Sequence, residues 1–240
     1  ACSNGGGTPR RLYTNNKSKY NGLFPLIPAL EGNGMQQLDL ALDFSEPNAY
    51  HDMTREGFFA LLMQQDRGKI QQSYELSKLP FVIDHLDKTK DSWISQAEFY
   101  CKTRRIVHLL RLGLLFVDLD TYHIPHMKGM NPDQQVAALL HWCDEEGIPY
   151  PSLVIFSGRG LQAKWLLDGT LPRKALPRWN AAQRYLVENM LPIGADPAAK
   201  DASRVLRLEH TINTKSGEMV HVVHVTEENG EPIRYNFEYL

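Results

Sequence analysis

The sequence predicts a mixed α/β (α+β) protein in which helices pack on a β-sheet. Short β-type apolar runs alternate with two amphipathic helical segments, and Gly, Pro and Asn signals separate them. The chain has 240 residues, of which 42% are apolar and 22% are charged, as in an ordinary globular protein. This length is sufficient for one large domain or two small ones, each with a buried core.

The N-terminal part of the chain gives structural signals but no recognisable chemistry. Residues 1–22 are low in complexity and are predicted to be a flexible tail, and residues 23–100 are predicted to form an N-terminal α/β lobe. Within this lobe, Thr54 is a candidate N-cap for a helix that runs to Gln65 with an apolar face. Residues 81–83, Phe-Val-Ile, are a candidate strand.

A strand–helix–strand unit is predicted in the middle of the chain. Asn131 is expected to cap its helix, Pro132 to occupy the first helical position, and Gly147 to end the helix. The strands of the unit are predicted at residues 112–119, 152–156 and 161–167, with a turn at residues 157–160 between the last two.

A second helix and a hairpin are predicted to follow. The turn Glu-Asn-Gly at residues 228–230 is expected to join strands at residues 219–225 and 233–239. The helix spans about residues 177–190, and its predicted inward face consists of Trp179, Ala182, Leu186 and Met190.

Composition argues against membrane-spanning and disulfide-stabilised classes. The longest apolar stretches are far too short to cross a bilayer, and the N-terminus has no apolar segment of a secretory signal. Cys2, Cys101 and Cys143 are widely spaced without a CxxC pair, which argues against a disulfide framework or a structural zinc site. We therefore expect a cytoplasmic protein with no membrane partner.

Two acids end an apolar strand at residues 116–120, Phe-Val-Asp-Leu-Asp. Because side chains alternate along a strand, Asp118 and Asp120 are expected on one face. Two carboxylates this close repel each other unless a cation lies between them, and Mg²⁺ or Mn²⁺ with oxygen ligands fits best. The alternative is a solvated strand end that carries two acids.

Two further polar blocks are suited to phosphate chemistry. The turn Ser-Gly-Arg-Gly at residues 157–160 allows backbone N–H groups to approach a phosphate closely, although it could also be an ordinary hairpin turn. Residues 194–215 contain Asp196 and two arginines, and guanidinium groups beside carboxylates suit a metal-bound triphosphate. A structural ion pair between Asp201 and Arg204 is the alternative for that block.

The three blocks, in this order, resemble the motifs of the archaeo-eukaryotic primase (AEP) superfamily, and most closely the primase domains of plasmid and mobile-element replication proteins. The likeness rests on FVDLD (116–120), SGRGLQAKW (157–165) and residues 194–215, and it extends over about half of the chain. It implies a catalytic sheet of RRM-like topology packed against the N-terminal α/β lobe, with residues 101–240 as the catalytic lobe.

The resemblance also implies an activity and a set of site residues. Asp118, Asp120 and Asp196 would bind two divalent ions, Mg²⁺ or Mn²⁺, and the enzyme would synthesise primers on single-stranded DNA from nucleoside triphosphates. A replicative helicase or further C-terminal domains are the implied partners. The nucleotide-binding residues would be Ser157, Arg159, Gln162, Lys164, Arg204, Arg207 and Lys215. Candidates for the walls of a template groove are Arg104, Arg105, Arg111, Lys174, Arg178 and Arg184.

The sequence departs from the AEP pattern at two places. Many members of the family carry a histidine on the strand after the Gly-rich turn, where this chain has Gln162 and then Lys164. The family also often shows Pro-Gly before a Thr-x-Asn segment, where this chain has Glu209-His210. Both departures affect the expected contacts with the triphosphate.

Two other functions remain open from the sequence. A rolling-circle nicking endonuclease would use a histidine pair, but His221 and His224 are three residues apart and regular alternation would separate them. His123 and His126, in a loop, are a second candidate pair. A non-catalytic origin-binding protein is the third possibility, although no recognition-helix pattern is present.

Overall fold

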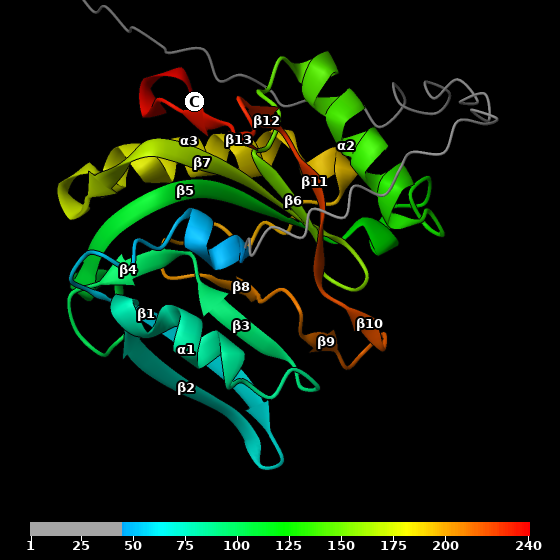
Figure 1. Cartoon of the computed structure of the whole chain (residues 1–240). Helices are drawn as coiled ribbons and strands as arrows, with labels where there is room; N and C mark the ends of the chain where they lie inside the picture. Colours follow the sequence, from blue (N-terminus) through cyan, green and yellow to red (C-terminus); the bar gives the residue numbers. More distant parts are fainter. Residues whose placement is uncertain (1–44) are drawn as a thin grey trace, which may run out of the picture. The chain divides into compact units, whose positions relative to one another are not determined.

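The fold is described for residues 45–240 of a computed structural model, and these residues belong to one compact unit (Figure 1). The predicted tail at residues 1–22 and the first part of the predicted N-terminal lobe lie outside the described residues. No helix in residues 45–240 has the length and apolar character needed to cross a membrane.

A ten-stranded sheet forms the centre of the described part. Its strands run in the order β11-β6-β7-β5-β4-β1-β3-β8, with β2 added at β1 and β14 at β7. Its strands are β1 (Phe58–Gln65), β2 (Gly68–Glu75), β3 (Ser92–Ser95), β4 (Ala97–Phe99), β5 (Leu109–Leu119), β6 (Leu153–Phe156), β7 (Leu161–Pro172), β8 (Val205–Arg207), β11 (His221–Val225) and β14 (Arg234–Tyr235).

Strands β4 and β5 pair directly, so the sheet continues across residue 100. The division into lobes at that residue stays a prediction. Mixed α/β architecture with packed helices, the predicted fold class, is confirmed.

Two long helices pack on the β5–β7–β6 half of the sheet (Figure 1). Helix α2 (Pro132–Glu146) begins as predicted, with a capping box between Asn131 and Gln134, and it ends at Gly147 in the left-handed conformation. Helix α3 (Leu176–Asn189) also confirms its prediction. The predicted inward side chains Trp179, Leu186 and Met190 are buried, and Ala182 packs against the same core.

The N-terminal elements differ from the prediction. Residues 58–65 form strand β1 and not a helix, and residues 81–83 lie in helix α1 (Leu79–Asp84) and not in a strand. Both segments are short apolar runs, for which periodicity alone does not separate helix from strand. The antiparallel partner β2 makes Phe58–Gln65 a strand, whereas Pro80 in the first turn favours a helix that buries Leu79 and Ile83.

The C-terminal hairpin is only partly as predicted. The turn at Asn229-Gly230 has positive φ at both residues and joins β12 (Glu227–Glu228) to β13 (Glu231–Pro232). The longer strands expected on either side do not pair with each other. Strand β11 pairs with β6 at the edge of the large sheet, and β14 pairs in parallel with β7 beyond the end of β6.

Three segments meet where β5 ends. The N–H group of Asp120 donates to the carbonyl oxygen of Gly194 at 2.7 Å, and the N–H group of Asp196 donates to the carbonyl oxygen of Asp118 at 2.8 Å. On the other side, β7 begins opposite Leu119, and a Cβ atom at Gly160 would lie 2.0 Å from the carbonyl oxygen of Leu119. The junction therefore requires glycine at position 160.

Substitution of Gly160 tests this junction. We expect Gly160→Ala to lower the free energy of unfolding by about 2 to 3 kcal/mol, because two backbone segments must separate to admit the methyl group. Gly169→Ala is the matched control, since a Cβ atom at Gly169 on β7 has no atom within 4 Å and its cost should stay within about 0.5 kcal/mol. Urea denaturation measures both, and equal costs would contradict the described junction.

Candidate active site

Asp118 and Asp120 line one pocket at the end of β5. The pocket has a volume of about 130 Å³ and lies where β5, β7, β3 and β8 approach one another. Both acids are half-buried. Strand alternation brings the two carboxylates to the same place, as the sequence led us to expect.

The electrostatics of the pocket disfavour two negative charges. Burial and the neighbouring charges of Asp120 and Asp196 together raise the pKa of Asp118 to about 6, against the opposing effect of Arg204 and Arg207. Without a cation, therefore, the surroundings of Asp118 destabilise its ionised form at neutral pH. Such perturbed acids are concentrated at functional sites.

The Gly-rich turn forms the next wall of the pocket. Ser157 and Arg159 line it together with Gln162 of β7, which lies directly opposite Asp118 in the sheet register. The guanidinium group of Arg159 stacks over the ring of Tyr122 at 4.2 Å from its centroid. Arg159 Nε and Gln162 Oε1 are buried and have no hydrogen-bond partner within residues 45–240. Both atoms are available to a ligand.

The third block contributes two arginines, each held by an acid. Arg204 donates to Asp196 at 3.0 Å, and Arg207 forms an ion pair with the buried Asp91. Both arginines line the pocket. Asp196 is thus bonded to the backbone of Asp118, but its carboxylate contacts Arg204 and the N–H group of Ala198.

No group of three or more His, Cys, Asp or Glu side chains in the described range is arranged as a ready metal site. Asp118 and Asp120 converge, whereas the third predicted ligand, Asp196, is turned toward Arg204. The free protein therefore presents two carboxylates and the oxygen of Gln162 to the pocket.

Lys164 and Lys215 do not line the pocket. Lys164 shares a strand face with Gln162 but is completely buried, where it forms an ion pair with Glu46 and lies 3.4 Å from the hydroxyl of Tyr50. Glu46 is also completely buried, and its backbone N–H group donates to the carboxylate of Glu209. Lys215 is exposed, and its N–H group donates to Asn213 at 3.2 Å.

Glu46, Lys164, Glu209 and Tyr50 form a buried cluster, in which the ammonium group of Lys164 is the one positive charge. Burial lowers the pKa of Lys164, and Glu46 opposes this effect. Burial and the charge of Glu46 raise the pKa of Glu209 to about 8, so this acid is protonated at neutral pH. The cluster fastens the turn at Glu46–Ala49 to β7 and to the segment after β8.

Sequence reasoning gave no role to four residues at this site, of which three line the pocket and one lies behind it. Trp93 on β3 and Tyr122 line it, as does Asn213, whose amide donates to the carbonyl oxygen of Ser157 at 2.8 Å. Asp91 lies behind Arg207, where burial raises its pKa but hydrogen bonds from Thr214 and Arg207 outweigh burial and lower it overall. Asn213 lies in the third sequence block, at residues 194–215, but was given no role there. Trp93, Tyr122 and Asp91 lie beside no other acid or glycine in the sequence, so no local signal marked them.

The predicted template-groove residues are dispersed. Arg104 lies near the site, since its guanidinium group bonds to Gln71 on β2 and to the carbonyl oxygen of Ser203. Arg111 instead forms an ion pair with the buried Glu98 at 2.6 Å, and Arg178 pairs with Glu238 at 2.6 Å. Those two arginines therefore have structural partners.

The histidine pairs also lie outside the pocket. His221 and His224 are on β11, where a register shift interrupts the alternation between them. His221 packs edge-on against Phe156, and His224 contacts the hydroxyl of Thr226 at 3.2 Å. His123 is exposed and lies against the ring of Tyr122.

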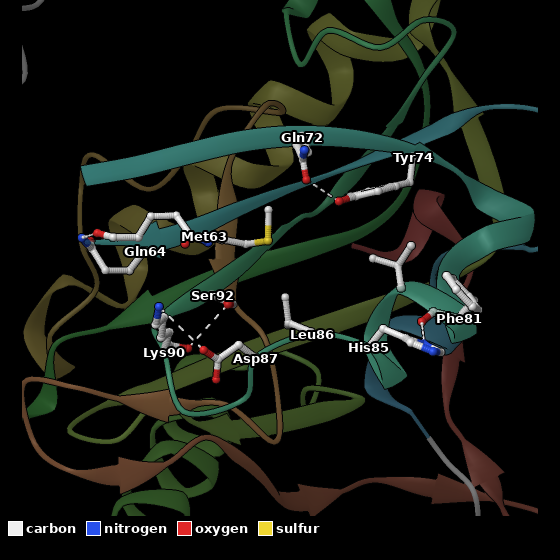
Figure 2. Close-up of a pocket in the computed structure, with 12 residues that line it drawn as sticks. Met63, Gln64, Gln72, Tyr74, Phe81, His85, Leu86, Asp87, Lys90 and Ser92 are labelled. Carbon is white, nitrogen blue, oxygen red and sulfur yellow. Dashed lines mark hydrogen bonds and ion pairs between the residues drawn. The ribbon is translucent and has the colours of Figure 1, made fainter. Parts of the chain in front are cut away.

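A larger cavity, of about 330 Å³, lies on the opposite face of β1 and β2, against α1 (Figure 2). Figure 2 shows Met63, Tyr74, Phe81 and Leu86 around it, with Lys90 paired to Asp87 at its rim. Its lining is largely apolar, with one acid, Asp87. We assign the candidate active site to the smaller pocket because that pocket collects the acids and arginines of all three sequence blocks.

The described fold is similar to that of a solved AEP domain. It matches the AEP domain of the cyanophage S-2L primase-polymerase (PrimPol) with a TM-score of 0.54 and 16% sequence identity, over 77% of this chain and 86% of that one. The catalytic domain of the primase RepB′, solved with initiator DNA, gives a TM-score of 0.45 and 16% identity over 74% and 82% of the two chains.

A replication protein of Clostridium perfringens is related in sequence. It is 34% identical over 169 residues, which represent 70% of this chain and 39% of that protein. The chain thus spans about two fifths of the length of that relative. No protein-family model matches the chain.

The raised pKa of Asp118 generates a stability prediction. The unfolded chain loses this proton near its ordinary pKa of 3.8 and the folded chain near 6, so stability falls as the pH rises between these values and stays lower above them. We expect Asp118→Asn to raise the free energy of unfolding at pH 7.5 by about 1 to 2 kcal/mol, and to change it little at pH 4. Thermal unfolding at both pH values, in the presence of a chelator, measures this. A variant that is less stable at pH 7.5 would contradict the described electrostatics.

The ion pair in the buried cluster leads to a second prediction about stability. Lys164→Met should lower the free energy of unfolding by about 3 to 5 kcal/mol, because it leaves the charge of Glu46 buried without a partner. Lys164→Met combined with Glu46→Gln should recover part of this loss, and Lys174→Met, at an exposed position, is the control. Urea denaturation separates the three, and an additive double variant would argue against the ion pair.

Proposed function

We propose that this chain is the catalytic domain of a DNA primase-polymerase. It would join nucleotides from nucleoside triphosphates into primers on single-stranded DNA, by nucleotidyl transfer. The observation that carries the proposal is the pocket in which Asp118 and Asp120 face the arginines of two distant motifs. The AEP fold and the related replication protein support it.

Divalent ions, Mg²⁺ or Mn²⁺, suit the donor set of this pocket. Asp118 and Asp120 supply hard carboxylate oxygens, and their mutual repulsion favours a cation between them. Asp196 would be the third ligand after exchanging its contact with Arg204. Bound ions would lower the pKa of the attacking 3′-hydroxyl and neutralise charge on the leaving pyrophosphate.

The triphosphate would be held by the cationic side of the pocket. Arg159, Arg204 and Arg207 line it and would bind the phosphate oxygens, as guanidinium groups do in bidentate fashion. Ser157 and the backbone of the Gly-rich turn lie beside them. Gln162 Oε1, buried without a partner within residues 45–240, would accept a hydrogen bond from the nucleotide or from a metal-bound water. Lys164 serves the buried cluster in this scheme.

The biological context is also a proposal. The related replication protein favours a role in plasmid or mobile-element replication, in which a replicative helicase or further C-terminal domains would be the partners. We propose a cytoplasmic location, in keeping with the sparse and unpaired cysteines Cys101 and Cys143.

Nucleotide incorporation tests the proposal. With a single-stranded template, labelled dNTPs or NTPs and Mn²⁺ or Mg²⁺, the wild-type chain should form oligonucleotides. Asp118→Asn and Asp120→Asn should each reduce the rate by at least about 10³-fold, since each removes a carboxylate that holds the cation. Gel electrophoresis of the products measures this.

The matched control is Asp168→Asn, on an exposed part of β7 far along the strand from the pocket. It makes the same chemical change and should leave the rate within about twofold. Products that persist when Asp118 and Asp120 are both replaced would refute the enzyme assignment.

A further inference from the structure

The hairpin β1–β2 presents one covered and one uncovered face in the described part of the chain. Phe59, Leu61 and Ile94 point toward α1 and form a small core with it. The residues that alternate with them point the other way. In register, Leu62 lies between Gln71 of β2 and Trp93 of β3, and Trp93 lies opposite Arg207 of β8.

These residues make a strip of side chains across four strands, which we call the β2–β8 strip. Its members are Lys69, Gln71, Leu62, Trp93 and Arg207, with Arg104 at its edge. The strip is continuous with the candidate active site, because Trp93 and Arg207 belong to both. It therefore extends the pocket outward to the exposed strand β2.

Cations surround the aromatic ring in the middle of the strip. Lys69 Nζ lies 4.1 Å from the centroid of the Trp93 ring, and the guanidinium carbon of Arg207 lies 5.1 Å from it. Lys69 is exposed, and Lys69 and Arg104 make no ion pair inside the described range. Within residues 45–240, the hydrogen bonds of Arg104 go to neutral partners, the amide of Gln71 and the carbonyl oxygen of Ser203.

The chemistry of the strip selects its ligand. An exposed lysine and amide, Lys69 and Gln71, and two half-buried arginines lie around one aromatic side chain. This combination suits a chain of phosphates with stacking bases, which is a single-stranded nucleic acid. A protein partner fits less well, because the core of a protein interface is depleted of lysine and rich in large apolar side chains. A duplex fits less well too, since within residues 45–240 α1 packs on the other face of β1 and the long helices α2 and α3 pack against β5, β7 and β11, so none of them lies on the strip to enter a groove.

We infer that the β2–β8 strip binds the single-stranded template where it leaves the active site. Lys69, Arg104 and Gln71 contact phosphate and sugar, and Trp93 contacts a base next to the templating position. This inference rests on the proposed function and assigns its template a path across β3, β1 and β2.

Binding of a labelled oligo-dT of about 20 nucleotides, by fluorescence anisotropy without metal or nucleotide, tests the strip. Lys69→Glu should weaken binding by about tenfold or more, and Lys69→Ala should reduce the slope of log affinity against log salt by about 1. Trp93→Ala should weaken binding by about five- to 100-fold, whereas Trp93→Phe keeps a ring and should retain most of it.

Lys78→Glu is the charge-matched control, because Lys78 is exposed in the turn that leads into α1 on the other face. It should change affinity by less than about twofold at 0.15 M salt, where charges beyond about 8 Å are screened. Equal losses for Lys69→Glu and Lys78→Glu would overturn the inference. So would a raised KM for the nucleotide in Lys69→Glu with template affinity unchanged.

The assay needs no synthesis, so the two proposals fail separately. If the chain forms no primers but Lys69→Glu still loses oligo-dT while Lys78→Glu does not, the strip stands and the enzyme assignment falls. If primers form and both charge variants bind as the wild type does, the strip falls and the enzyme assignment stands.

Discussion

Electrostatic repulsion between Asp118 and Asp120 is the constraint on which the site depends. The backbone holds both acids at the end of β5, because Asp120 bonds to Gly194 and Asp118 bonds to Asp196. Gly160 fits against Leu119 on the other side and leaves this end of the strand no room to move. Holding two like charges together therefore lowers the free energy of unfolding of the free protein, and a bound cation would raise it again.

The arginines of the site are matched to this arrangement. In the free protein Arg204 neutralises Asp196, and Arg207 neutralises Asp91. Both guanidinium groups are therefore engaged by acids, and a triphosphate would have to take the place of these partners. A metal-bound nucleotide would supply both halves of the exchange, since its cations attract Asp196 and its phosphates attract Arg204. Binding of metal and nucleotide should consequently be coupled.

Local rules predicted the elements whose signals are local. The cap at Asn131, the stop at Gly147 and the strand that ends in Asp118 follow from neighbouring residues, and the structure has them. Residues 58–65 and 81–83 were mispredicted because their conformation depends on β2 and on burial against the sheet. The role of Lys164 was equally out of reach, since its partner Glu46 lies 118 positions away. Trp93 joins the pocket only through the pairing of β3 with β8.

Crystals soaked with Mn²⁺ and a nucleoside triphosphate would test the central claim most directly, through anomalous scattering from the metal. We expect manganese peaks in contact with Asp118 and Asp120, with Asp196 rotated away from Arg204 and the triphosphate against the arginines. Manganese bound elsewhere, or a triphosphate seated in the cavity beside α1, would contradict it.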